Sequence, residues 1–132
     1  MFLLTAIFNS ACLDDVLRDL TDSGVEGVTI SHVSGKGGLG IKMDDGTTRL
    51  YKNVRIEIIV STEAFKELAK EAIRANTRDL ETGSGKMWVT PVLEVERLRT
   101  GEKDKDALAH SKLPKTRRLN GNFRAAVDTP AS

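Results

Sequence analysis

Residues 50–73 read LYKNVRIEIIVSTEAFKELAKEAI, and within this stretch the spacing of apolar residues changes once. Up to Val60 the apolar residues alternate with polar ones such as Arg55 and Glu57, which is typical of a strand with one buried face. Beyond Glu63 they recur at helical spacing, at Phe65, Leu68, Ala69, Ala72 and Ile73. The stretch therefore predicts a strand over residues 50–60 that is followed directly by an amphipathic helix.

The junction between these two elements carries residues that commonly begin helices. Ser61 or Thr62 can accept a hydrogen bond from the first free backbone N–H groups of the helix. Glu63 stands in the first turn, where a negative charge complements the helix dipole. Either hydroxyl can serve as the N-cap, so the sequence leaves that choice open.

A similar pair of elements opens the chain. Residues 2–8 are almost wholly apolar, as in a central strand, and the apolar residues that follow recur at helical spacing: Leu13, Val16, Leu17 and Leu20. Gly24 ends that helix, and residues 25–33 return to the alternating pattern of a strand. A last strand is expected over residues 87–95.

The predicted order is strand, helix, strand, strand, helix, strand, with a glycine-rich loop at 34–48 between the two middle strands. This is the order of the α+β ferredoxin-like fold, βαββαβ, in which an antiparallel four-stranded sheet carries both helices on one face. The strands are more apolar than a solvent-exposed second face allows. We therefore expect that face to be buried against further copies of the chain in an oligomer.

The composition fits one domain followed by a basic segment. The 132 residues carry 20 Lys and Arg against 19 Asp and Glu, so the overall charge gives no reason to expect a polyanionic partner. From residue 109 onward Asp128 is the one carboxylate among several basic residues: Lys112, Lys115, Arg117, Arg118 and Arg124. Residues 109–132 are expected to form a basic tail that is mobile when free. With Phe123 as its one aromatic residue, the tail is not expected to bind nucleic acid.

Several residue types argue against particular kinds of site. Cys12 is the only cysteine, so no disulfide can form within the chain, and it is expected to be a buried small hydrophobe. His32 and His110 have no partner at ligand spacing, so no metal site is predicted. Trp88 is expected in the core. No apolar run is long enough to span a bilayer, and we expect a cytoplasmic protein.

The loop at 79–86 ends in Gly83-Ser84-Gly85-Lys86, which is similar to the end of a phosphate-binding P-loop. That motif needs a glycine where Glu81 stands and a helix behind it, whereas a strand-favouring run follows here. A glycine loop that ends in lysine can still present N–H groups and one ammonium to phosphate oxygens. Arg97 and Arg99, two apart on a chain expected to be extended, could point to one side and donate to further phosphate oxygens.

Three loop sequences, in this order of elements, resemble those of the PII signal-transduction protein superfamily. Residues 27–37, GVTISHVSGKG, resemble the strand that enters the family's T-loop, here about residues 36–52. The loop at 79–86 is similar to a shortened B-loop, and residues 97–102, RLRTGE, are close to the C-loop. The resemblance covers residues 1–108 and implies a homotrimer built from one such domain per chain.

The resemblance also implies that an adenine nucleotide, ATP, ADP or AMP, binds between subunits of the trimer. The residues that carry over are Thr29 toward the adenine, Gly35 and Gly37 near the ribose and phosphates, Lys86, Arg97 and Arg99 on the polyphosphate, and Gly85 and Ser84 as loop backbone. Ser84 replaces the family's usual Asp.

Three positions depart from the PII proteins that sense 2-oxoglutarate. Leu39 stands where a T-loop glutamine completes a magnesium site, so the base of this loop is not expected to hold magnesium. Asn53 stands where a lysine pairs with the keto acid, and Tyr51 lies at the exit of the loop instead of its tip. The sequence predicts weak or absent 2-oxoglutarate sensing and no nucleotidylation of Tyr51.

These features indicate a non-enzymatic regulator that reads adenine nucleotide and controls a membrane transporter through its T-loop. Loss of the keto-acid determinants favours the divergent PII-like branch and a transporter for inorganic carbon, bicarbonate, by analogy with that branch. The alternative within the family is a nitrogen-type PII regulator of ammonium transport.

Two readings from other classes remain alongside the regulator. A slow ATP or ADP phosphohydrolase could use the same site with a loop carboxylate as its base: Asp44, Asp45 or Asp79. A trimeric scaffold would bind no nucleotide, and its C-loop arginines would form surface ion pairs with nearby glutamates: Glu94, Glu96 or Glu102.

Overall fold

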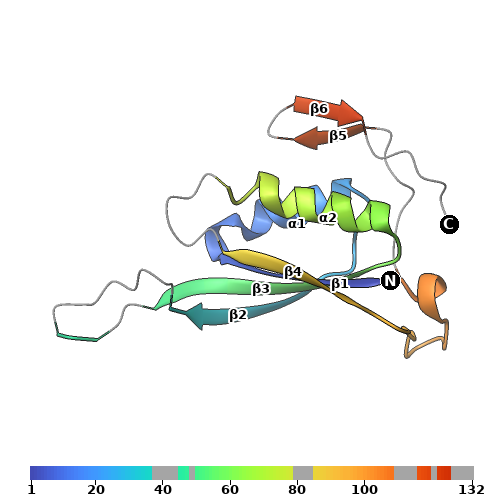
Figure 1. The fold of residues 1–132 in the computed structure, drawn as a ribbon, viewed down its shortest axis with the longest axis horizontal. Helices are drawn as coiled ribbons and strands as arrows, with labels where there is room; N and C mark the ends of the chain where they lie inside the picture. The colour runs from blue at the N-terminus through green and yellow to red at the C-terminus, as the bar shows by residue number, and fades with distance from the viewer. Residues whose placement is uncertain (37–44, 48–49, 79–84, 109–115, 120–121, 126–132) are drawn as a thin grey trace.

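The structure is a computed structural model that describes residues 1–36, 45–47, 50–78 and 85–108, together with the backbone of 116–119 and 122–125. Its main body has two layers, a four-stranded sheet and two helices that lie against one face of that sheet (Figure 1). The predicted ferredoxin-like arrangement is confirmed.

Neighbouring strands of the sheet are all antiparallel, in the order β2-β3-β1-β4. The elements in chain order are β1 Phe2–Asn9, η1 Ser10–Cys12, α1 Leu13–Asp22, β2 Thr29–Gly35, β3 Tyr51–Val60, α2 Glu63–Ala75, β4 Lys86–Pro91 and η2 Asp104–Ala107. α1 connects β1 to β2 and passes over β3, whereas α2 connects β3 to β4 and passes over β1. Each helix therefore joins two strands that are not neighbours in the sheet. This crossing places both helices over the centre of the sheet.

The core lies between the two central strands and the helices. Its strand side consists of cross-strand partners in β1 and β3 that are at most 1% exposed: Leu4 and Ile58, Ala6 and Ile56, Phe8 and Val54. The apolar stripes of the helices close it from above, with Val16 and Leu20 from α1 and Leu68 and Ala69 from α2. Burying each large side chain stabilises the fold by roughly 1.5–3 kcal/mol.

The end of α1 explains why β2 begins later than the alternation suggested. Gly24 has a φ of +87°, and the N–H of Val25 donates to the carbonyl of Leu20 at 2.9 Å. This arrangement satisfies a terminal carbonyl of the helix and buries Val25, which is 1% exposed. The strand predicted to start at Val25 therefore starts at Thr29.

The helix cap that the sequence left open is Thr62. Its side-chain oxygen accepts a hydrogen bond from the N–H of Phe65 at 3.2 Å. At the other end of α2, the Asn76 side chain donates to the carboxylate of Asp19 in α1 at 3.0 Å. These contacts fix where α2 begins and how its end lies against α1.

β4 is shorter than predicted because the chain leaves the sheet after Pro91. Pro91 pairs with Phe2, and the N–H of Val92 then donates to the carbonyl of the first residue at 3.0 Å. Leu93 follows and is 95% exposed. The strand predicted to reach Val95 therefore ends at Pro91, where the chain leaves the sheet.

Within the tail, the structure describes a short antiparallel hairpin that no pattern in the sequence predicted. Its strands are β5, Thr116–Leu119, and β6, Asn122–Ala125. The remaining tail residues lie outside the described part of the chain, so the predicted mobility of the tail stays a prediction. Among the described residues, no helix is long and apolar enough to cross a membrane.

Candidate functional site

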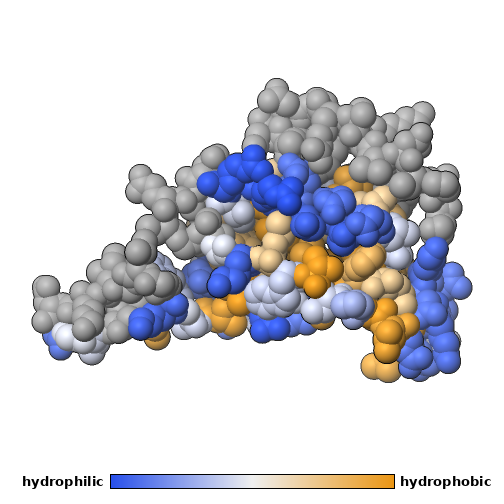
Figure 2. Space-filling view, viewed as in Figure 1, coloured by the Kyte–Doolittle hydropathy of each residue, from blue (hydrophilic) through white to orange (hydrophobic). Residues whose placement is uncertain are grey.

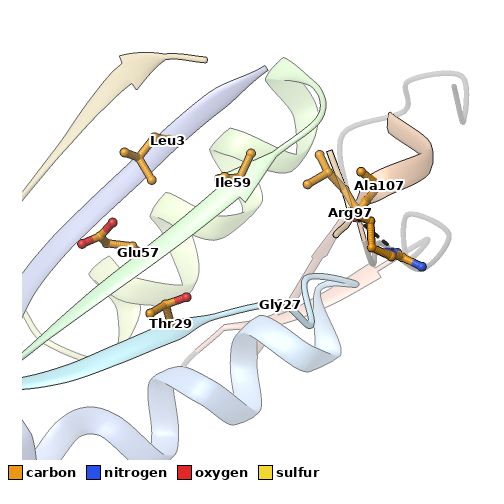
Figure 3. A pocket seen from close by; sticks show the side chains of 8 residues that line it. Leu3, Gly27, Thr29, Glu57, Ile59, Arg97 and Ala107 are labelled. Carbon is orange, nitrogen blue, oxygen red and sulfur yellow. Dashed lines mark hydrogen bonds between the residues drawn. The ribbon is translucent and has the colours of Figure 1, made fainter. Parts of the chain in front are cut away.

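A cavity of about 560 Å³ lies on the face of the sheet opposite the helices, because the residues of β1 and β3 that line it alternate with those of the core. Its lining comes from the strands and from the segment that follows β4: Leu3, Gly27, Thr29, Glu57, Ile59, Arg97, Ala107 and Leu108. Figure 3 shows the strand residues spread along the sheet, with Arg97 and Ala107 at one end of them. We call this the sheet-face cavity.

The floor of the sheet-face cavity combines an apolar and a polar part. Leu3 and Ile59 are cross-strand partners, and so are Thr29 and Glu57. A flat, partly apolar ligand could therefore lie against the aliphatic pair while a hydroxyl and a carboxylate meet its polar edge. Such a floor suits a nucleoside better than a bare anion.

Arg97 is held at the edge of the cavity by two hydrogen bonds. Its Nη2 donates to the carbonyl of Ala107 at 3.2 Å, the dashed line in Figure 3, and its Nη1 donates to Glu102 Oε1 at 3.2 Å. The Glu102 pairing is one of the ion pairs expected under the scaffold reading. It does not exclude a ligand, because a guanidinium has five N–H donors.

The expectation that Arg97 and Arg99 lie side by side on extended chain is wrong. Residues 98–100 form a turn, which closes when the N–H of Gly101 donates to the carbonyl of Arg97 at 2.8 Å. Arg97 lines the cavity, whereas Arg99 is exposed and is not among its lining residues. Gly101 has a φ of +75°, a conformation that lets the chain reverse here.

Three of the other predicted site residues, Gly35, Gly85 and Lys86, lie toward the opposite end of the sheet. Lys86 pairs with Ile7 in β1, and Gly85 precedes it with a φ of +87°. Gly35 ends β2, where it pairs with Tyr51. Gly37 and Ser84 lie outside the described residues.

Strand geometry separates these two groups within one chain. Lys86 faces Ile7, four residues along β1 from Leu3, which is about 13 Å at the rise of an extended strand. Gly35 lies six residues beyond Thr29 on β2, about 20 Å away. Within one chain, Lys86 and Gly35 therefore lie toward the other end of the sheet from the residues that line the cavity.

Sequence reasoning missed Glu57 as a residue of the site. The alternation of β3 already placed it with Arg55 on the face away from the core. What the pattern could not show was that residues 97–108 come back beside that face. Ala107 and Leu108 were missed for the same reason.

Trp88 was expected in the core, and the structure corrects this. It is 39% exposed, and it shares a cross-strand row with Thr5 and Glu57 on the open face. The Arg55 guanidinium lies 6.0 Å from its ring centre and donates to Glu57 Oε1 at 3.1 Å. Thr5 beneath them is 1% exposed, so these side chains cover part of the open face.

Asn53 lies on the same open face, at the end of the sheet near the T-loop. Its Cα partners are Asn9 and Val33. Its Oδ1 is buried and has no hydrogen-bond partner among the residues that the structure describes. The position therefore offers an uncharged amide to this part of the sheet.

Two groups with shifted pKa values bear on chemical reactivity. The N–H and hydroxyl of Thr47 both donate to Asp45 Oδ1, and these hydrogen bonds lower the pKa of Asp45. A lowered pKa makes Asp45 a poor general base. Burial, with a smaller effect of Asp15, raises the pKa of the Cys12 thiol, as suits the predicted buried cysteine.

Comparison with known proteins decides the family. The family model described as Nitrogen regulatory protein P-II matches residues 1–102. The chain belongs to the PII family. The resemblance read from the three loops is thereby confirmed, and the family is one of regulatory signal proteins.

Individual PII relatives are similar over nearly their whole length. The chain is 39% identical over 110 residues to Nitrogen regulatory protein P-II 1 of Methanothermobacter thermautotrophicus, covering 80% of this chain and 95% of that protein. Nitrogen regulatory protein P-II of Azospirillum brasilense is 35% identical over 115 residues, with coverage of 80% and 97%. For that of Cyanidium caldarium the identity is 38% over 110 residues, with coverage of 80% and 96%.

The PII match ends before two residues of the cavity. Residues 103–132 lie beyond the family model, and they include Ala107, Leu108 and the tail hairpin. Part of the lining of the sheet-face cavity, Ala107 and Leu108, thus belongs to chain that the family model does not match.

Proposed function

We propose that the chain is a non-enzymatic PII regulator that binds adenine nucleotide between subunits of a homotrimer and controls a membrane transporter. The observation that carries this proposal is the division of the predicted site residues into two groups at opposite ends of one sheet. Each group is chemically incomplete by itself, and a neighbouring copy can supply the other.

The sheet-face cavity would take the nucleoside. Leu3 and Ile59 offer an apolar surface to the base, and Thr29 and Glu57 offer a hydroxyl and a carboxylate to its amine or to the ribose hydroxyls. Arg97 at the cavity edge would meet the first phosphates.

The other end of the sheet, on the adjacent copy, would complete the phosphate site. Lys86 supplies an ammonium, and Gly85 lets the loop backbone approach closely. Gly35, Gly37 and Ser84 would add backbone N–H groups. Arg99, exposed in the C-loop turn, would reach the phosphates from outside.

The surface of the single chain favours assembly. The open face carries Trp88 at 39% exposure, and the segment after β4 carries Leu93 and Leu98, each 95% exposed. Figure 2 shows apolar colour at the lower right corner, where that segment turns. Burying these leucines against a second copy would stabilise an oligomer by about 2 kcal/mol for each side chain.

The choice between the two kinds of transporter depends on the residue at the base of the T-loop that would meet a keto acid. Asn53 provides no positive charge for a keto acid, which favours inorganic carbon over nitrogen as the regulated nutrient. The second candidate is control of ammonium transport, and the names of the PII relatives favour it. Response to 2-oxoglutarate separates the two.

The phosphohydrolase reading has weaker support. Asp45 has a lowered pKa and is already hydrogen-bonded to Thr47, so it is poorly suited to take a proton from water. Asp44 and Asp79 lie outside the described residues.

Isothermal titration with ATP, ADP, AMP and cyclic AMP tests the proposal. The wild-type protein should bind at least one of the first three, and Arg97→Ala should weaken that binding by about tenfold to a hundredfold, because a charge-assisted hydrogen bond is lost. The matched control is Arg18→Ala, since Arg18 pairs with Asp15 on α1, in the helix layer.

Two outcomes would contradict the proposal. Absence of binding to any nucleotide would leave the scaffold reading, and equal losses in both arginine variants would show that Arg97 does not meet the ligand. Addition of 2-oxoglutarate with Mg-ATP should leave the affinity unchanged. A strong synergy would instead support a nitrogen regulator.

A further inference from the structure

The C-loop holds Arg97 through Glu102. Arg97 Nη1 donates to Glu102 Oε1, and Nη2 donates to the Ala107 carbonyl, both at 3.2 Å. These two bonds fix the plane of the guanidinium and leave further N–H donors for a ligand. The Arg97 side chain is 33% exposed, so a ligand in the cavity can still reach it.

Glu102 is itself held by the turn that it closes. The Thr100 hydroxyl donates to Glu102 Oε1 at 2.8 Å and accepts from the Glu102 N–H at 3.3 Å. The N–H of Arg97 also donates to the carbonyl of Glu102 at 2.8 Å. The carboxylate that meets Arg97 is therefore positioned by the backbone and by a second side chain.

We propose that Glu102 is a positioning residue for ligand binding, which orients the Arg97 guanidinium before an anionic ligand arrives. The inference rests on the proposed function, because it concerns the same site. A free arginine loses rotamer freedom when it binds a phosphate, whereas an arginine already held in its plane has little left to lose.

A carboxylate could also weaken binding, since it repels phosphate and competes for Arg97. The geometry favours positioning. The Glu102 side chain is 43% exposed, so solvent and salt screen its repulsion of a ligand beyond Arg97, whereas its hydrogen bond to Arg97 acts at contact.

Titration of Glu102→Gln with the tightest-binding nucleotide tests this role. Glutamine keeps the size and one acceptor oxygen but loses the charge, and affinity should fall about threefold to tenfold. Thr100→Val, which removes the hydroxyl that holds the carboxylate, should cause a smaller loss, and Thr100→Ser should restore the affinity. The matched control is Glu96→Gln, because Glu96 lies next to Arg97 in the chain and pairs with Lys103 instead.

A double-mutant cycle separates positioning from a merely structural role. In an Arg97→Lys background, Glu102→Gln should cause no further loss, because lysine cannot keep two planar hydrogen bonds. Equal losses in both backgrounds, an affinity equal to that of Glu96→Gln, or tighter binding would each overturn the inference. If the wild-type protein binds no nucleotide, the proposed function and this inference fall together. If the wild-type protein binds nucleotide and Glu102→Gln has the same affinity, this inference fails and the proposed function stands.

Discussion

At the scale of single residues, Gly85 belongs to the predicted phosphate-binding loop and also has a role in packing. Its φ is +87°, and a Cβ on it would lie 1.7 Å from the carbonyl oxygen of Ile7. The phosphate-loop reading explains this glycine by close approach to a ligand. The structure adds a second reason, because the loop must touch the backbone of β1 for Lys86 to begin β4 beside Ile7.

Gly85→Ala should destabilise the protein strongly, because the backbone of a central strand cannot move aside. We expect a loss of about 3 kcal/mol or more in the free energy of unfolding. The control is Gly46→Ala, which shares the positive φ, at +85°, but has no atom of the described residues within 4 Å of the added Cβ. That variant should lose only about 1–2 kcal/mol.

Chemical denaturation at one fixed protein concentration measures both variants. Similar losses for the two would mean that backbone conformation, and not the contact with Ile7, makes residue 85 a glycine.

At the scale of elements, local signals predicted type and order well. The change of period after Val60 placed β3 and α2 correctly, and the cap lay at one of the two positions expected. The errors fell at ends that depend on other segments. β4 stops where its pairing with β1 ends, and the expected extended chain after Arg97 is a turn closed by hydrogen bonds.

Thr62→Ala should destabilise α2 by removing its N-cap. The expected loss is about 1 kcal/mol in the free energy of unfolding, and Thr62→Ser should recover most of it. Ser61→Ala is the matched control, since no hydrogen bond of its side chain to the described residues is present. A larger effect at Ser61 would contradict the assignment of the cap.

At the scale of the whole molecule, each chain contributes to two of the proposed sites, with one group of residues at each end of its sheet. Arg97 lies at one end of the open face and Lys86 at the other. Symmetric assembly can bring the first group of one copy to the second group of the next, as in a closed ring.

Mixed assemblies test this arrangement directly. Arg97→Ala and Lys86→Ala chains should each bind nucleotide weakly when alone. When they are refolded together in equal amounts, about one quarter of the sites should recover both residues and bind tightly, as follows from random mixing in a ring.

The control is the double variant that carries both Arg97→Ala and Lys86→Ala, refolded alone in the same way. It should recover no tight sites. Titration stoichiometry measures the recovered fraction. If the mixture of single variants also recovers no tight sites, both residues of a site come from one chain or do not meet the ligand.

The sequence by itself determined the order of elements, the two faces of β3, the capping region of α2 and the family. These follow from periods, caps and loop motifs, which depend on residues close together along the chain. The tertiary structure alone decided that residues 97–108 return beside β2 and β3, that Glu57 shares a cavity with Arg97, and that Lys86 lies toward the other end of the sheet. The physical reason is that these distances depend on strand register and on a turn held by non-local hydrogen bonds, which no local pattern encodes.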